Sequence, residues 1–146
     1  MSNELFIKKT VTINAAAMQV WDALVNPEKT KQYMYGCEAI SDWKVGSPLL
    51  WNGVADGKTI TYVKGNIVSF DPGKRLQFTV FDPHGSYEDI PSNYLHVTYE
   101  LFEDNGKTTL TVTQGDYSKV AEGEKRYQHS LKDWDIIQLL KEVAEK

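Results

Sequence analysis

The hydrophobic pattern of this 146-residue chain alternates at first, becomes helical, alternates again over a long central part and ends as helical. Residues 5–13 alternate and predict a half-buried strand. Residues 15–25 place their apolar side chains on one helical stripe, and Asn14 is a suitable N-cap for that helix. Pro27 favours the start of a second, short helix over about residues 28–33.

Six further stretches have the alternation and composition of β-strands. They are residues 38–43, 49–55, 59–70, 75–81, 93–102 and 107–115. Asp56-Gly57 and Asn105-Gly106 are dipeptides typical of two-residue hairpin turns. Consecutive strands joined by tight turns predict an antiparallel meander.

The parity of apolar residues predicts which side chains of these strands face the core, because side chains alternate across a strand. The inward residues predicted for the last three strands are Leu76, Phe78, Val80, Leu95, Val97, Tyr99, Leu101, Leu110, Val112 and Gln114. In the strand at 59–70, the parity of Val63, Gly65 and Ile67 is favoured. The opposite parity includes Tyr62, Lys64 and Asn66, and the facing of these three residues is left open.

Residues 118–146 form the longest helical pattern in the chain. Their apolar residues recur mainly in steps of three, from Leu131 through Trp134 to Val143. Each such step falls about 60° short of a full turn, so the apolar line winds around the helix. We expect this helix to lie diagonally across the buried face of a twisted sheet, because no other predicted element is long enough to cover it.

Composition and charge exclude several classes of protein. The net charge of -4 disfavours nucleic acid or an anionic membrane as the main partner. The single cysteine, Cys37, excludes an intrachain disulfide framework. No stretch resembles a signal peptide or approaches the ~20 apolar residues that span a bilayer. We therefore expect one soluble, cytoplasmic domain over residues 1–146.

Candidate catalytic chemistry is sparse. The sequence holds no nucleophile-elbow motif, phosphate-binding loop or histidine pair at metal-ligand spacing, so no catalytic residue, metal site or cofactor is predicted. His96, Thr98 and Glu100 share one face of a strand and would form an acid/base row if that face lined a pocket. The opposite face is more apolar, so we interpret the row as solvated.

Local motifs and element order together carry a family resemblance. The motifs are residues 20–28 (VWDALVNPE), 65–68 (GNIV), 71–76 (DPGKRL) and 108–114 (TTLTVTQ). The chain resembles the START-like, helix-grip superfamily (SRPBCC, Bet v 1-like). Its nearest branch is the one named for homologues of the activator of the 90-kDa heat-shock-protein ATPase. The resemblance implies an α+β fold, in which a curved antiparallel sheet of about seven strands wraps around a long C-terminal helix, with two short helices after the first strand.

The resemblance also implies a cavity between the sheet and the C-terminal helix. Residues predicted to line it are Trp51, Phe78, Val80, Val97, Tyr99, Val112, Gln114, Tyr127, Leu131 and Trp134. Gln114 is the favoured polar group, because a buried amide needs a partner. We expect the Tyr127 end of the helix to roof the cavity, the Leu140 end to anchor it, and residues 33–35 and 82–92 to lie near the mouth.

Three functional hypotheses follow. The first is non-enzymatic binding of a small hydrophobic or amphipathic ligand in that cavity. The second is a protein-interaction module that regulates a chaperone, and it requires a contiguous exposed apolar patch. The third is a cyclase-like or hydrolase-like enzyme, which requires ionisable groups such as His96 or Glu100 inside the cavity. The identity of the ligand and the oligomeric state stay open.

Overall fold

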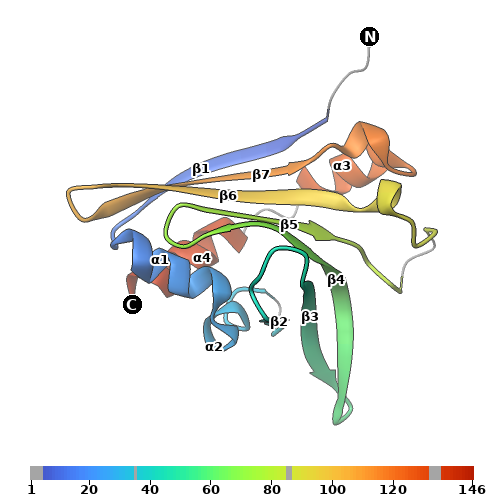
Figure 1. Ribbon diagram of the computed structural model, residues 1–146, viewed down its shortest axis with the longest axis horizontal. Coiled ribbons are helices and arrows are strands. Elements are labelled where there is room, and N and C mark those ends of the chain that lie inside the picture. The colour runs from blue at the N-terminus through green and yellow to red at the C-terminus, as the bar shows by residue number, and fades with distance from the viewer. Residues whose placement is uncertain (1–4, 35, 85–86, 132–135) are drawn as a thin grey trace.

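One antiparallel sheet organises the chain (Figure 1). The computed structural model describes residues 5–34, 36–84, 87–131 and 136–146. The strands are β1 (Ile7–Ile13), β2 (Glu38–Ser41), β3 (Pro48–Ala55), β4 (Lys58–Asp71), β5 (Arg75–Val80), β6 (Leu95–Asp104) and β7 (Lys107–Gly115). Their order is β1-β7-β6-β5-β4-β3-β2, so β2 to β7 form the predicted meander and β1 pairs with β7. The predicted α+β helix-grip fold is confirmed.

Two hairpin turns have the geometry that their sequences predict. Asp56 and Gly57 have φ of 52° and 75°, and Asn105 and Gly106 have φ of 54° and 76°. Positive φ at both central residues matches the twist of the flanking strands, and Asp, Asn and Gly adopt it at little cost. These turns fix the β3–β4 and β6–β7 registers.

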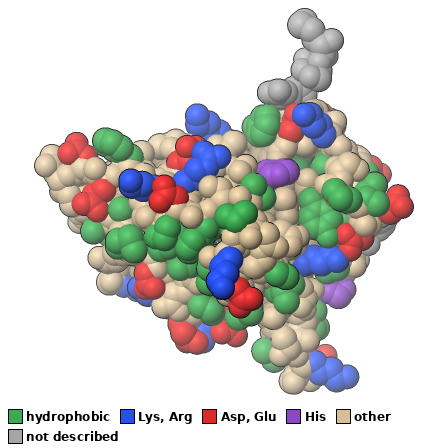
Figure 2. Space-filling model, viewed as in Figure 1, with side chains coloured by type: hydrophobic (Ala, Val, Ile, Leu, Met, Phe, Trp, Pro, Cys, Tyr) green, Lys and Arg blue, Asp and Glu red, His purple; other side chains and the backbone are tan. Residues whose placement is uncertain are grey.

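The helices lie at the two ends of the sheet. They are α1 (Ala17–Val25), α2 (Pro27–Thr30), α3 (Gly123–Leu131) and α4 (Ile136–Glu145), with 3-10 turns η1 (Pro91–Asn93) and η2 (Tyr117–Lys119). Figure 1 shows α1 and α4 together at one end and α3 beside the opposite ends of β6 and β7. On the face of the molecule that is turned to the viewer in both figures, charged and apolar side chains are interspersed (Figure 2).

The C-terminal helical pattern begins later than predicted. The chain forms η2 near Ser118, Val120 is extended with ψ of 160°, and Glu122 has φ of 50°. Because neither residue has helical dihedral angles, the helix begins only at Gly123. The predicted start at residue 118 was therefore wrong.

The C-terminal end of the chain is anchored as predicted. Leu140 and Val143 are buried, and α4 contacts both α1 and β1. The side chain of Gln19 on α1 adds a hydrogen bond, since its Nε2 donates to the carbonyl oxygen of Ala144 at 2.6 Å. Together α1 and α4 cover one end of the sheet.

The start of α1 differs from the sequence-based prediction. Its N-cap residue is Ala16, which forms no side-chain cap, so the prediction of Asn14 was wrong. Instead the carboxylate of Glu103, at the end of β6, accepts a hydrogen bond from the backbone N–H of Ala17. The N–H of Asn14 donates to Glu145 Oε2 at 2.8 Å. Residues distant in sequence thus supply the cap.

Buried apolar residues form two clusters. The larger packs residues of the sheet against α1 and α4 and includes Tyr33 and Cys37 from the segment between α2 and β2. The smaller consists of Ile7, Leu95, Tyr117 and Val120, with Tyr127 packed against it. Val80 packs against both clusters, so it marks the boundary between them.

Candidate functional site

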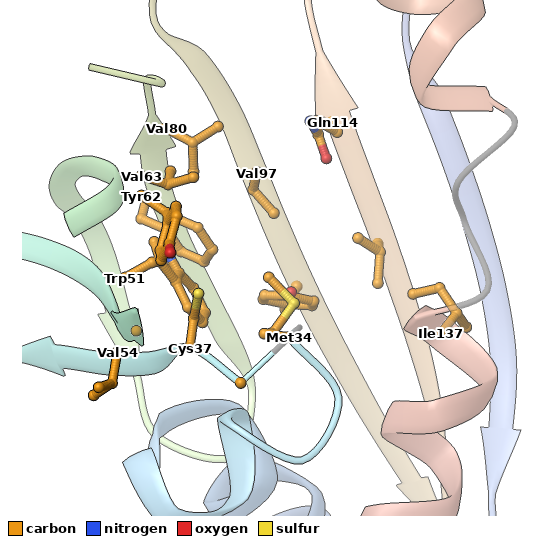
Figure 3. A pocket seen from close by; sticks show the side chains of 15 residues that line it. Met34, Cys37, Trp51, Val54, Tyr62, Val63, Val80, Val97, Gln114 and Ile137 are labelled. Atoms are coloured by element: carbon orange, nitrogen blue, oxygen red, sulfur yellow. The ribbon is translucent and has the colours of Figure 1, made fainter. Parts of the chain in front are cut away.

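A cavity of about 470 Å³ lies against the inner face of strands β3 to β7 (Figure 3). We call it the apolar cavity. Its lining residues are Met34, Gly36, Cys37, Trp51, Gly53, Val54, Tyr62, Val63, Phe78, Val80, Val97, Tyr99, Val112, Gln114 and Ile137. The volume falls in the range of small-molecule sites in proteins.

Aromatic side chains form much of the sheet wall. Phe78 on β5 is paired in register with Val97 on β6, while Tyr99 is paired with Val112 on β7. The ring of Phe78 lies 6.0 Å from that of Trp51 and 5.9 Å from that of Tyr99. These centroid distances are typical of packed aromatic pairs, so the wall is continuous across β3, β5 and β6.

A β-bulge brings one further aromatic residue to the cavity. Trp51 pairs with Val63, but Asn52 pairs with Thr61, so Tyr62 is an extra residue in β4. A bulge re-aims the side chains beside it. Tyr62 and its neighbour Val63 therefore both line the cavity, although they are adjacent in sequence.

The rest of β4 follows the favoured parity. Gly65 and Ile67 are buried, as predicted for the inward set. Lys64 forms an ion pair with Asp89 on the other side, and Asn66 is exposed. Of the three residues whose facing the sequence leaves open, Tyr62 therefore lines the cavity, whereas Lys64 and Asn66 do not.

The segment between α2 and β2 supplies the opposite wall. Met34 and Cys37 point into the cavity, and Ile137 contributes from the start of α4 (Figure 3). Tyr33 is buried instead, where its hydroxyl donates to the carbonyl oxygen of Ala23 at 2.7 Å. Tyr35 lies outside the described residues. Burial raises the pKa of the Cys37 thiol, so it stays neutral at physiological pH.

No Asp, Glu, Lys, Arg or His is present among the described residues that line the apolar cavity. Its polar groups include the amide of Gln114 and the hydroxyl of Tyr99. Nε2 of Gln114 donates to Oη of Tyr117 at 2.8 Å, which leaves the amide oxygen as an acceptor. Burial raises the pKa of Tyr99 to about 12, and within the described residues its hydroxyl has no hydrogen-bond partner.

Seven of the ten residues predicted to line the cavity do so. They are Trp51, Phe78, Val80, Val97, Tyr99, Val112 and Gln114. Tyr127 is not among the lining residues, which corrects its predicted place in the roof. Its ring packs edge-on against Tyr117 with centroids 5.7 Å apart. Trp134 and the side chain of Leu131 lie outside the part of the chain that the structure describes.

Several lining residues were missed at the sequence level. Gly36 and Cys37 precede β2, where alternation gives no signal, and Val54 has the opposite parity to Trp51 near the end of β3. Gly53 shares the parity of Leu49 and Trp51 and could have been included. Val63 had the correct parity and could have been included. For Tyr62 no signal was available, because a bulge is not visible in a single sequence.

The candidate acid/base row lies outside this cavity. His96 and Glu100 are exposed on the other face of β6, and Glu100 Oε2 lies 3.3 Å from Nη1 of Arg75 on β5. The predicted solvated face is confirmed for His96 and Glu100, but it was wrong for Thr98 between them, which is buried. Within the described residues, no group of three or more His, Cys, Asp or Glu side chains is placed to hold a metal ion.

A family model matches residues 14–141 of the chain and describes activator of Hsp90 ATPase homolog 1-like proteins. The chain belongs to this family. The comparison with curated proteins found no match.

Three solved structures illustrate the similarity. A protein from Cytophaga hutchinsonii is 36% identical, with 94% of this chain and 91% of that chain covered and a TM-score of 0.74. The Aha1 dimer from Colwellia psychrerythraea is 15% identical, with 96% of each chain covered and a TM-score of 0.70. An HSP90 activator from Plasmodium falciparum is 14% identical, with 77% and 73% covered and a TM-score of 0.62.

Family and fold together support a small-ligand-binding or Hsp90-regulator-like module. Among the described residues, no helix is long and apolar enough to cross a membrane.

Proposed function

We propose that the protein binds a small apolar or amphipathic molecule in the apolar cavity without catalysing a reaction on it. The observation that carries this proposal is an aromatic and aliphatic lining without a charged side chain among the described residues. Such a lining favours a molecule whose buried part is uncharged, because an unpaired charge loses its hydration there.

The polar groups suggest how such a molecule would be oriented. The hydroxyl of Tyr99 and the amide oxygen of Gln114 offer a donor and an acceptor on neighbouring strands. A few placed polar groups in an apolar site fix the orientation of a ligand. Since none of the described residues that line the cavity is an Asp, Glu, Lys, Arg or His, the two groups supply binding and no proton transfer.

Binding of Nile red, a neutral fluorescent dye, tests the proposal with a cavity-filling variant. Val97→Phe adds a ring beside the cavity and should lower the affinity for the dye at least several-fold. Val68→Phe is the matched control, because Val68 is 40% exposed on the same sheet. Equal binding by the wild type and a folded Val97→Phe variant would contradict the proposal.

Native mass spectrometry addresses the physiological ligand. The protein purified from its own host should carry a co-purifying molecule that the Val97→Phe variant carries at lower occupancy. Equal occupancy in both proteins would place that molecule outside the apolar cavity.

Chaperone regulation is the second candidate function, and the family favours it. The β3–β4 hairpin projects from the rest of the molecule (Figure 1), and Val54 on it is 72% exposed. Exposed apolar side chains on a projecting element suit a contact with a partner protein. Recombinant Hsp90 from the same host should bind the protein and lose binding with Val54→Asp. Failure of the wild type to bind would remove this candidate.

A further inference from the structure

A second cavity of about 410 Å³ borders the apolar cavity. Its lining residues are Val63, Val80, Phe81, Asp82, Tyr87, Leu95, Tyr117, Lys125 and Arg126. Val63 and Val80 line both cavities, so the two spaces meet at this pair of strands. Both valines are only half-buried. They therefore form a low ridge between the cavities.

A polar contact links the same two spaces. Gln114 lines the apolar cavity, Tyr117 lines the second cavity, and Nε2 of Gln114 donates to Oη of Tyr117. Figure 3 shows Gln114, Val63 and Val80 at one end of the apolar cavity, away from Met34 and Cys37. The end of the apolar cavity that holds the Gln114 amide is thus the end that borders the second cavity.

The second cavity differs from the first in carrying charge. Lys125 and Arg126 on α3 are its cations, and Asp82 is its anion. Oδ1 of Asp82 already accepts a hydrogen bond from the backbone N–H of His84 at 2.8 Å. Within the described residues Lys125 forms no ion pair. The lining therefore has an excess of positive charge.

Arg126 is held in place at this cavity. Its Cζ lies 4.4 Å from the centroid of the Tyr87 ring, and Nη1 donates to the carbonyl oxygen of Ala121 at 3.3 Å. The Tyr87 hydroxyl in turn donates to Glu122 Oε2 at 3.1 Å. A guanidinium has five N–H donors, so Arg126 keeps donors for another group. A fixed guanidinium suits a carboxylate or phosphate, which it can bind through two oxygens.

We propose that the second cavity binds the acidic end group of an amphipathic molecule whose apolar part occupies the apolar cavity. This inference rests on the proposed function and narrows it to amphiphiles with a carboxylate or phosphate. The apolar part lies across Val63 and Val80, and the acid group lies against Lys125 and Arg126.

Three probes with the same alkyl chain test the inference. Lauric acid, lauryl phosphate and lauryl alcohol should each displace Nile red, because all three have the apolar part. One or both acids should bind about tenfold tighter than the alcohol, as expected for a charge-assisted hydrogen bond. The preference should weaken with added salt, since the second cavity is open to solvent.

Variants that remove one positive charge from α3 test whether Lys125 and Arg126 cause the preference for acids. Arg126→Gln and Lys125→Gln should each lower the affinity for the preferred acid about three- to tenfold and leave the affinity for lauryl alcohol unchanged. Arg126→Lys should retain part of the preference. Lys119→Gln is the control, because Lys119 is exposed nearby and lines neither cavity.

The outcomes separate this inference from the proposed function. If the alcohol binds as tightly as both acids, or if the α3 variants leave acid binding unchanged, the acidic end group is refuted and the apolar cavity keeps its proposed role. If none of the three probes displaces the dye and the dye itself does not bind, the proposed function fails and this inference fails with it.

Discussion

Nε2 of Gln114 donates a hydrogen bond to Oη of Tyr117 over 2.8 Å, and this contact joins the lining of one cavity to the lining of the other. Tyr117 is fully buried, so the contact also satisfies a polar group in the smaller apolar cluster. The same amide thus stabilises the fold and provides an acceptor to the apolar cavity.

Gln114→Leu should separate these two roles. The variant removes a donor to the buried Tyr117 hydroxyl, so the free energy of unfolding in urea should fall by about 1–2 kcal/mol. Nile red should bind no more weakly, because the cavity becomes more apolar. Gln128→Leu is the exposed control and should change stability by less than about 0.5 kcal/mol. A loss of dye binding together with unchanged stability would contradict this assignment.

Much of the fold could be predicted from the sequence because its signals are local. The alternation of apolar and polar side chains in residues 95–102 and 107–115 predicts a sheet with one buried face. Asp56-Gly57 predicts a tight turn. The cap of α1 could not be predicted, because Glu103 is 86 positions away in sequence from Ala17. The predicted start of the C-terminal helix failed because periodicity reports which face is apolar and does not report where helical dihedral angles begin.

The candidate site was predictable where the strands are regular. Parity placed Phe78, Val97, Tyr99 and Val112 correctly, since each belongs to an uninterrupted strand. It could not place Tyr62, because a bulge shifts the register and inverts the parity beyond it.

Substitution by alanine should lower stability by different amounts at two glycines on neighbouring strands, Gly65 on β4 and Gly53 on β3. A Cβ on Gly65 would lie 1.6 Å from the carbonyl oxygen of Thr79, which is backbone of β5 and cannot move without breaking the sheet. Gly65→Ala should therefore lower stability by more than about 3 kcal/mol or prevent folding. A Cβ on Gly53 would lie 2.9 Å from the Tyr62 ring and 3.6 Å from Sγ of Cys37, and both are side-chain atoms. Gly53→Ala should cost less than Gly65→Ala and mainly shift Tyr62, seen as altered Nile red affinity. Equal losses in thermal melts would contradict the packing at Gly65.

The pKa of Tyr99 predicts a loss of stability at alkaline pH. Burial raises this pKa to about 12, whereas an unfolded tyrosine ionises near its usual value of 10.0. Between these values the unfolded chain has lost a proton that the folded chain keeps, so stability should fall as pH rises. The contribution of Tyr99 is about 2–3 kcal/mol by about pH 12.

Urea unfolding at about pH 9 and about pH 11.5 measures this dependence. Tyr99→Phe should reduce the alkaline loss without abolishing it, because burial also raises the pKa of Tyr33. Val97→Ala removes no titratable group, so it should lower stability equally at both pH values. An alkaline loss unchanged in Tyr99→Phe would show that Tyr99 ionises similarly in both states.

Capping of α1 from a distant strand leads to the last prediction. The carboxylate of Glu103 accepts from the Ala17 N–H, whereas Asn14 contributes no side-chain cap. Glu103→Ala should therefore lower the free energy of unfolding by about 1 kcal/mol, the usual cost of losing a helix cap. Asn14→Ala should change it by less than about 0.5 kcal/mol. Because local sequence rules rank these residues in the opposite order, a larger loss in Asn14→Ala than in Glu103→Ala would refute the long-range cap.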